Sequence, residues 1–153
     1  QIKLDAASSR ILRELQRDSR QTVQELSAKA GLSVSPCWRR VKELEATGVV
    51  RRYTALVERE KVGLSACILA QVSLLRQTEG AAEQFESAMH ACAEVIECYS
   101  VTGDADYVIK VVLPDVKAYD AFLHRVMFKI KDIGTLRSMV VLREVKYETA
   151  LPV

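Results

Sequence analysis

One short stretch of this sequence gathers the side chains that proteins use to contact nucleic acid. At helical spacing it places a hydroxyl, an indole, a guanidinium and an ammonium group on one face, with no acid among them. These residues are Ser35, Trp38, Arg39 and Lys42. Arg side chains read guanine in the major groove, and hydroxyl groups contact phosphate. The pattern favours a helix that reads DNA; the alternative is a solvated amphipathic helix whose exposed face is merely basic.

Two features favour the DNA-reading interpretation. An indole such as that of Trp38 is a poor choice for a surface that only meets water. The preceding residues also supply the first half of a helix-turn-helix, because Thr22 and Glu25 form a capping-box pattern before a short helix that ends at Gly31. Ser33 then suits the N-cap of the second helix, and Pro36 suits its first turn. An apolar stripe at positions i, i+4 and i+7 is expected to face the core: Cys37, Val41 and Leu44.

A first helix and a flanking strand are expected on either side of this pair. Asp5 is the expected N-cap of a helix that ends near residues 18–20 and closes a three-helix core. Residues 49–57 are rich in β-formers and predict a strand that flanks the helices like a wing. Its two arginines would contact phosphate or else be solvated. The full set expected to contact DNA is Ser33, Ser35, Pro36, Trp38, Arg39, Arg40, Lys42, Arg51 and Arg52.

Composition narrows the class of protein. With 49% hydrophobic and 27% charged residues over 153 positions, the chain has the balance of a soluble globular protein. It shows neither a signal-peptide pattern nor a membrane-length apolar run, so we expect a cytoplasmic protein. Its four cysteines form no C-x-x-C pair, so no metal site or disulfide framework is expected. Residues 1–60 hold 12 Lys and Arg against 8 Asp and Glu, whereas residues 61–153 hold 10 against 12. The basic end is therefore the end with the helix pair, as nucleic-acid contact requires.

The second part of the chain predicts an α+β domain. Apolar runs, helical periods and turn residues follow one another in the order βαββαβ, the ferredoxin-like arrangement. The last strand is expected over residues 136–147. We therefore divide the chain into a winged helix-turn-helix domain at 1–50, a strand and linker arm at 51–62, and an effector-binding and oligomerisation domain at 63–153.

The first strand of this domain predicts an assembly. One of its faces is wholly apolar and can be covered by the two helices, while the other carries Leu69 and Leu75 among Cys67, Gln71 and Ser73. No third helix is expected to cover that second face. A second copy of the same sheet is the economical cover, so we expect a homodimer built through this domain.

The order and spacing of many short pieces resemble the leucine-responsive/asparagine-responsive (Lrp/AsnC, feast/famine) family of transcription regulators over essentially the full length. The pieces include 4–5, 18–20, 32–37, 48–50, 97–99, 102–107 and 145–146. One departure is Ser8, where the family usually has a second acid. The resemblance implies a winged helix-turn-helix followed by a ferredoxin-like sensing domain. It also implies dimers that assemble further, commonly to octamers, with amino acids as effectors.

The loop at residues 102–106 is the leading candidate for the effector site, and its alternative is an ordinary hairpin turn. A free amino acid needs a carboxylate for its ammonium group and donors for its carboxylate. Asp104 or Asp106 would supply the first. Expected donors and neighbours are Tyr99, Thr102, Gly103 and Ser138. Which aspartate faces the effector is left open.

The sequence thus predicts a DNA-binding transcriptional regulator of amino-acid metabolism or transport, modulated by a small amino acid and acting on double-stranded operator DNA. No Ser/His/Asp set, phosphate loop or close carboxylate pair stands out, so neither enzymatic activity nor a cofactor is expected. The alternative is an amino-acid-binding enzyme or stand-alone sensor whose N-terminal helices serve assembly. An assembly helix has no need of the basic face described first, which separates the two hypotheses.

Overall fold

A computed structural model of the chain describes residues 3–76 and 78–153. It divides into two compact units, one made of residues 1–56 together with 146–153, the other of residues 57–145. The C-terminal eight residues therefore belong with the N-terminal helices, although the sequence placed them in the second domain. Among the described residues, no helix has the length and apolar content needed to span a bilayer.

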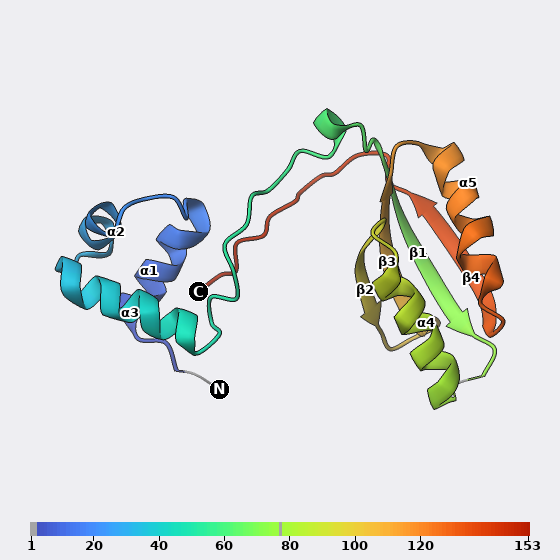
Figure 1. Cartoon of the computed structure of the whole chain (residues 1–153), viewed down its shortest axis with the longest axis horizontal. Helices are drawn as coiled ribbons and strands as arrows, with labels where there is room; N and C mark the ends of the chain where they lie inside the picture. Colours follow the sequence, from blue (N-terminus) through green and yellow to red (C-terminus); the bar gives the residue numbers. More distant parts are fainter. Residues whose placement is uncertain (1–2, 77) are drawn as a thin grey trace. The chain divides into compact units, whose positions relative to one another are not determined.

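The N-terminal unit is built on three helices, α1 (Ala6–Arg17), α2 (Val23–Ala30) and α3 (Val34–Ala46) (Figure 1). The predicted caps of the first two are present: Asp5 accepts from the Ser8 amide, and Thr22 and Glu25 form a complete capping box. Gly31 ends α2 with a left-handed φ of 66°, a conformation that disfavours side chains with a Cβ. The core is one cluster of residues from all three helices: Ile11, Leu12, Leu26, Ala30, Cys37, Val41 and Leu44.

Two local predictions for this unit are wrong. Ser33 does occupy the N-cap of α3, but its hydroxyl makes no capping hydrogen bond. Residues 51–57, most of the wing strand predicted at 49–57, have no regular secondary structure. A strand exists only where its backbone pairs with another, and within the described residues of a single chain nothing pairs with this one.

The C-terminal unit is a four-stranded antiparallel sheet in the order β2-β3-β1-β4, the ferredoxin-like order predicted from the βαββαβ pattern. Its strands are β1 (Ala66–Leu74), β2 (Val95–Ser100), β3 (Tyr107–Leu113) and β4 (Ile133–Val140). The helices are α4 (Glu79–Ala91) and α5 (Val116–Arg125), with short 3-10 turns η1 (Glu60–Val62) and η2 (Met127–Lys129). β4 ends seven residues before the predicted end, and the chain runs on without secondary structure.

Strand alternation gives this sheet one covered face and one open face. Ile68, Ala70 and Val72 of β1 pair with Val111, Ile109 and Tyr107 of β3, and all six are buried in the core cluster. Phe85 and Met89 of α4 and Tyr119 and Phe122 of α5 belong to the same cluster, so both helices lie on the same side (Figure 1). On the open face, Leu69 pairs with Lys110 and Met139. Met139 is 46% exposed, so this face leaves large apolar surface uncovered in the single chain.

Thr22 and Ser33, the N-cap residues of α2 and α3, provide a matched test of helix capping in the N-terminal unit. Thr22→Ala should lower the free energy of unfolding of this unit by about 1 kcal/mol, because it leaves an amide of the first turn of α2 unpaired. Ser33→Ala should cost much less, because no capping bond is lost. Denaturant unfolding can be followed by the fluorescence of Trp38, the single tryptophan, which lies in this unit. Equal losses in the two variants would contradict the difference in capping.

Candidate DNA-binding and effector sites

α3 presents two chemically different faces, as its sequence predicts. Cys37, Val41 and Leu44 are at most 9% exposed and pack against α1 and α2. Trp38 is 53% exposed, and its neighbour Arg39 is exposed as well. Ser35 and Pro36 in the first turn are also open to solvent. Burial of the apolar stripe is thus what turns an indole, a guanidinium and a hydroxyl outward together.

Arg40, also predicted as a DNA contact, lies outside this outward set, because its guanidinium group already has partners inside the unit. Its Nη1 donates to Asp5 Oδ2 at 2.7 Å and to the Ser8 hydroxyl at 3.1 Å. The Ser8 amide and hydroxyl, and then Arg40, lower the pKa of the Asp5 carboxyl to about 2. Arg40 therefore fastens α3 to the start of α1, and in this way it fixes the orientation of the helix that carries Arg39.

Lys42 is exposed but already has an acidic partner. Its ammonium group lies 2.7 Å from Glu45 Oε2, one turn along α3, and Glu45 Oε1 accepts a 2.9 Å hydrogen bond from the Tyr53 hydroxyl. Bonds from Lys42 and Tyr53 lower the pKa of Glu45, while burial and then Glu45 raise the pKa of Tyr53 to about 12. A phosphate contact by Lys42 would have to compete with this ion pair.

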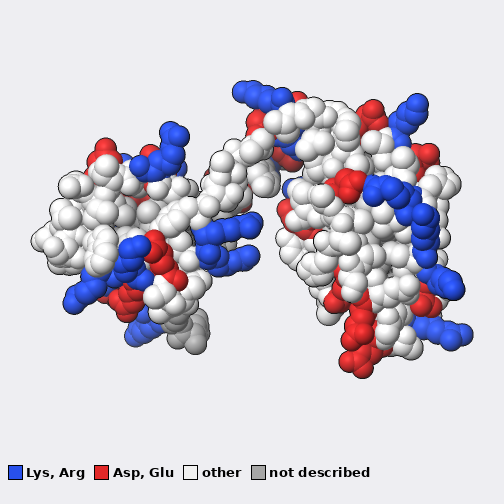
Figure 2. All heavy atoms as spheres, in the orientation of Figure 1, with Lys and Arg blue, Asp and Glu red and all other residues white. Residues whose placement is uncertain are grey.

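The remaining basic residues of the unit lie in a mixed field of charge. Arg51 and Arg52 are exposed and follow Val50, whose amide donates to the Leu44 carbonyl near the end of α3. On the face that Figure 2 shows, Lys and Arg side chains of this unit alternate with Asp and Glu and do not form one continuous basic patch. Any attraction to DNA is therefore modest for one copy and falls as salt rises.

The loop at residues 102–106 connects β2 to β3 and is tied to the end of β1. The Asp106 amide donates to the Val72 carbonyl at 3.0 Å, and the Ser73 hydroxyl donates to the Asp104 carbonyl at 3.1 Å. Gly103 has a φ of 117°, which permits the sharp reversal between them. These bonds hold the loop in one shape beside the sheet.

The two aspartates of the loop differ in how their carboxylates are used. Asp106 is half-buried, and its Oδ2 accepts a 2.7 Å bond from the Leu74 amide. Asp104 is exposed, and among the described residues its carboxylate accepts no hydrogen bond. Asp106 thus has a structural role at the end of β1, whereas the negative charge of Asp104 is open to a ligand.

Two cavities of about 330 Å³ each lie beside this loop and along β2. The first is lined by Leu74, Thr78, Ala82, Val101 and Asp106, at the beginning of α4. The second lies between α4 and β2 and is lined by Glu86, His90 and Cys98, among others. Ser100 and Tyr107 line both. A volume of this size fits a small organic molecule.

Comparison with known proteins matches each of the two units to a described protein family. The model described as the Lrp/AsnC ligand binding domain matches residues 67–151, and that described as winged helix-turn-helix DNA-binding matches residues 4–51. The leucine-responsive regulatory protein of Klebsiella pneumoniae is 37% identical over 148 residues, which are 97% of this chain and 90% of that protein. This chain belongs to the Lrp/AsnC family. The resemblance drawn from the sequence is therefore confirmed, as is the fold class.

Solved Lrp/AsnC structures resemble the chain over nearly its whole length. A transcriptional regulator from Neisseria meningitidis, in complex with L-Met, is 36% identical, with a TM-score of 0.93 over 98% of this chain and 97% of that one. The feast or famine regulatory protein from M. tuberculosis, complexed with L-methionine, is 33% identical, with a TM-score of 0.83 over 96% and 97% of the two chains. These relatives are regulators, so this Lrp/AsnC chain is a DNA-binding transcription regulator and not an enzyme.

Ser138 is not brought to the predicted effector loop. It pairs with Ala70 in the middle of β1, on the side that the helices cover, and its hydroxyl lies 2.6 Å from the Tyr119 hydroxyl of α5. Tyr99 lies on the open face, where its hydroxyl donates to Glu97 at 3.2 Å. Thr102 and Gly103 are exposed within the loop itself. The loop and Tyr99 thus remain as the candidate set, and Ser138 instead anchors α5 to the sheet.

Sequence reasoning also missed the contacts made by the last residues of the chain. The side-chain amide of Gln16 accepts a 2.6 Å bond from the Leu151 amide and donates a 3.1 Å bond to the Leu151 carbonyl. Arg13 donates to the Val153 carbonyl at 3.2 Å, and Val153 packs against the three-helix core. Partners 135 and 140 residues apart leave no periodic signal in the sequence.

The neighbouring arginines of α3 should separate stability from DNA binding. Arg40→Gln should lower the unfolding free energy of the N-terminal unit, because Asp5 and Ser8 lose their contacts with the Arg40 guanidinium group. Arg39→Gln should leave stability nearly unchanged but weaken binding to a specific DNA fragment about tenfold or more. Trp38 fluorescence in denaturant and fluorescence anisotropy with labelled DNA measure the two effects. An Arg39 variant that binds DNA like the parent would contradict the proposed reading face.

Proposed function

We propose that this regulator controls genes of amino-acid metabolism or transport by binding their operator DNA through α3. The observation that carries the proposal is the joint exposure of Trp38 and Arg39 on a helix whose other face is buried. The name and function of its relatives, one of them a leucine-responsive regulatory protein, support an amino-acid link. A protein that acts on operator DNA works where the DNA is, so the proposal includes a cytoplasmic location.

The proposed effector is a small, mostly apolar amino acid held at the 102–106 loop. The Asp104 carboxylate is the group that would hold its ammonium, and the Thr102 hydroxyl with the Gly103 amide would meet its carboxylate. The adjoining cavity offers Leu74, Ala82 and Val101 to an apolar side chain. L-methionine bound to two solved relatives supports this class of ligand.

Effector control follows from linkage. An amino acid changes DNA affinity only if it binds two conformational or assembly states of the regulator unequally. Its effect on DNA binding and the effect of DNA on its own binding must then be the same factor. The proposal therefore requires an effector-binding site in the C-terminal unit and a second conformational or assembly state of the molecule. The effector only has to bind and does not have to react.

The proposed assembly is a homodimer formed through the open face of the sheet. Such dimers would join into larger oligomers, commonly octamers, as the resemblance to the Lrp/AsnC family implies. Leu69 and Met139 supply apolar surface that a second sheet would remove from water. Several helix-turn-helix units in one particle would also compensate for the modest charge of each, because linked sites bind at high effective concentration.

Asp104 gives the sharpest test of the effector site. Asp104→Ala should abolish the change of DNA affinity with L-methionine or L-leucine, while affinity without amino acid persists, because the loop lies in the other unit. Asp104→Asn keeps an acceptor but loses the charge, so it should weaken the response less than Ala does. DNA anisotropy against amino-acid concentration measures the midpoint for each variant. Asp120→Asn, an exposed acid on α5, is the matched control. A parental midpoint in Asp104→Ala would place the ammonium group elsewhere.

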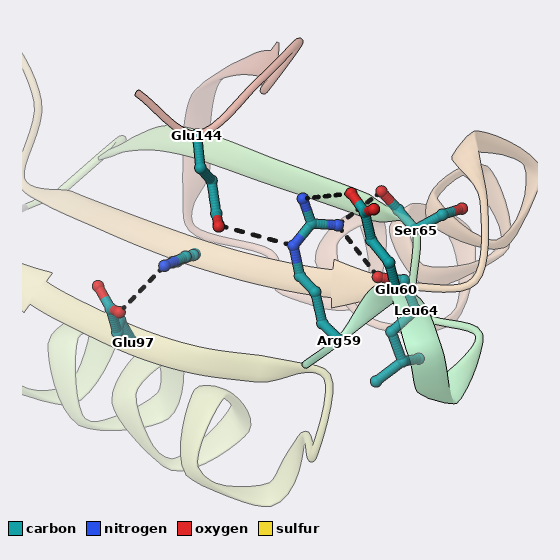
Figure 3. A network of polar contacts seen from close by, with 7 residues as sticks. Arg59, Glu60, Leu64, Ser65, Glu97 and Glu144 are labelled. Carbon is teal, nitrogen blue, oxygen red and sulfur yellow. Dashed lines mark hydrogen bonds and ion pairs between the residues drawn. The ribbon is translucent and has the colours of Figure 1, made fainter. Parts of the chain in front are cut away.

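Leu69→Glu tests the assembly. The substitution would bury a second carboxylate beside Lys110, which already pairs with Glu97 (Figure 3), between two sheets, so the particle should dissociate or aggregate. Val116→Glu changes an exposed residue in the first turn of α5 and should keep the parental oligomer. Sedimentation velocity separates the outcomes. A folded Leu69 variant with the parental oligomeric state would exclude the sheet-to-sheet dimer.

A further inference from the structure

An acidic side chain, Glu45, lies at the edge of the reading face of α3, the face that carries Ser35, Trp38, Arg39 and Lys42. Glu45 follows Trp38 by seven residues and Lys42 by three. Residues at these spacings lie on the same side of a helix, one above the other. The basic face of α3 therefore ends in a carboxylate.

The Glu45 carboxylate is held from two sides. Its Oε2 lies 2.7 Å from the Lys42 ammonium group, and its Oε1 accepts a 2.9 Å hydrogen bond from the Tyr53 hydroxyl. All three residues belong to the N-terminal unit. The Glu45 side chain is 29% exposed, compared with 54% for Lys42. Lys42 is thus tethered to a partner that is itself fixed at a second point.

This tether changes what Lys42 offers to DNA. An ammonium group beside a carboxylate has little net charge left to attract a phosphate, and it must give up the carboxylate before it binds one. Exposed ion pairs are weak, so a well-placed phosphate can still displace Glu45. Arg39 has no ion pair among the described residues, and its guanidinium group meets DNA without this cost.

The cost falls unequally on the two ways of binding DNA. Sequence-independent binding rests almost wholly on phosphate contacts, and the protein can slide until each free cation meets a phosphate. Specific binding draws part of its affinity from base contacts, and the fixed register of the specific complex also fixes the place of Lys42 relative to the backbone. A tethered Lys42 therefore weakens mainly the sequence-independent mode.

We propose that Glu45 is a specificity-determining residue of this regulator. It withholds Lys42 from phosphate, and so it lowers the affinity for DNA of any sequence more than the affinity for the specific site. A contact that penalises the wrong partners is a general way to gain specificity at some loss of total affinity. The inference rests on the proposed function, because it takes α3 as the helix that lies on the DNA.

Glu45→Gln in the full-length protein tests the inference. Glutamine keeps an acceptor for the Tyr53 hydroxyl but removes the charge that pairs with Lys42, so the fold persists while the lysine is released. Affinity for a duplex of random sequence should rise about threefold or more, and the slope of log affinity against log salt should steepen by about 0.9 for each α3 on the DNA. Affinity for a fragment selected with the parent should rise less. Fluorescence anisotropy with both labelled duplexes at several salt concentrations measures these effects.

Two controls separate this role from a general loss of negative charge. Glu43→Gln removes the same charge from an exposed position of α3 whose carboxylate has no bonded partner in the described part of the chain, and it should keep the parental salt slope. In a Lys42→Gln background, Glu45→Gln should change neither affinity, because the cation that it releases is gone.

Three results would overturn the proposal: a parental affinity of Glu45→Gln for random-sequence DNA, an equal rise for both duplexes, or a Glu45→Gln effect that persists without Lys42. Arg39→Gln in the same titrations tests the proposed function separately. If that variant binds the selected fragment like the parent, the reading face itself is wrong. The comparison of Glu45→Gln with the double variant still decides whether Glu45 withholds Lys42 from phosphate.

Discussion

Burial of three side chains on α3 is the constraint from which the reading face follows. Cys37, Val41 and Leu44 occupy the core made with α1 and α2, and they are nearly inaccessible to water. The helical period fixes the direction of each side chain around the axis of α3. Because these three side chains point into the core, those of Trp38 and Arg39 point toward solvent. The functional face is thus specified by hydrophobic burial, and the polar contacts around it refine an orientation that packing has already chosen.

Those polar contacts give three neighbouring basic residues three different roles. Arg40 is used inside the unit, where it holds Asp5 and Ser8. Lys42 shares its charge with Glu45, while Arg39 has no ion pair among the described residues. Only the last is fully available to a DNA base without first losing an internal partner. Counting basic residues therefore overestimates the charge that this helix offers, which is consistent with the modest net charge of the N-terminal half.

Periodicity and caps were enough to predict most of the fold, because both are local. The stripe on α3, the capping box before α2 and the βαββαβ order each depend on residues a few positions apart. Pairing over long separations was not predictable: Arg40 with Asp5, Gln16 with Leu151, and Ser138 with Tyr119 leave no periodic trace. The predicted wing strand is wrong for a related reason. β-forming residues favour an extended backbone, but a strand also needs a neighbouring strand to pair with. In the effector loop, residue types indicated two aspartates, and only the bond from Leu74 distinguished them.

The two segments that pass between the units leave an unusual amount of apolar surface in water. Leu56 and Val57 are each 68% exposed, and Leu142 and Val145 are 95% and 86% exposed. Large apolar side chains gathered on extended, unpaired backbone favour pairing with another chain, because such pairing satisfies the backbone and removes the side chains from water together. The proposed assembly would therefore have two kinds of apolar surface to remove from water: the open face of the sheet, with Met139, and these extended segments.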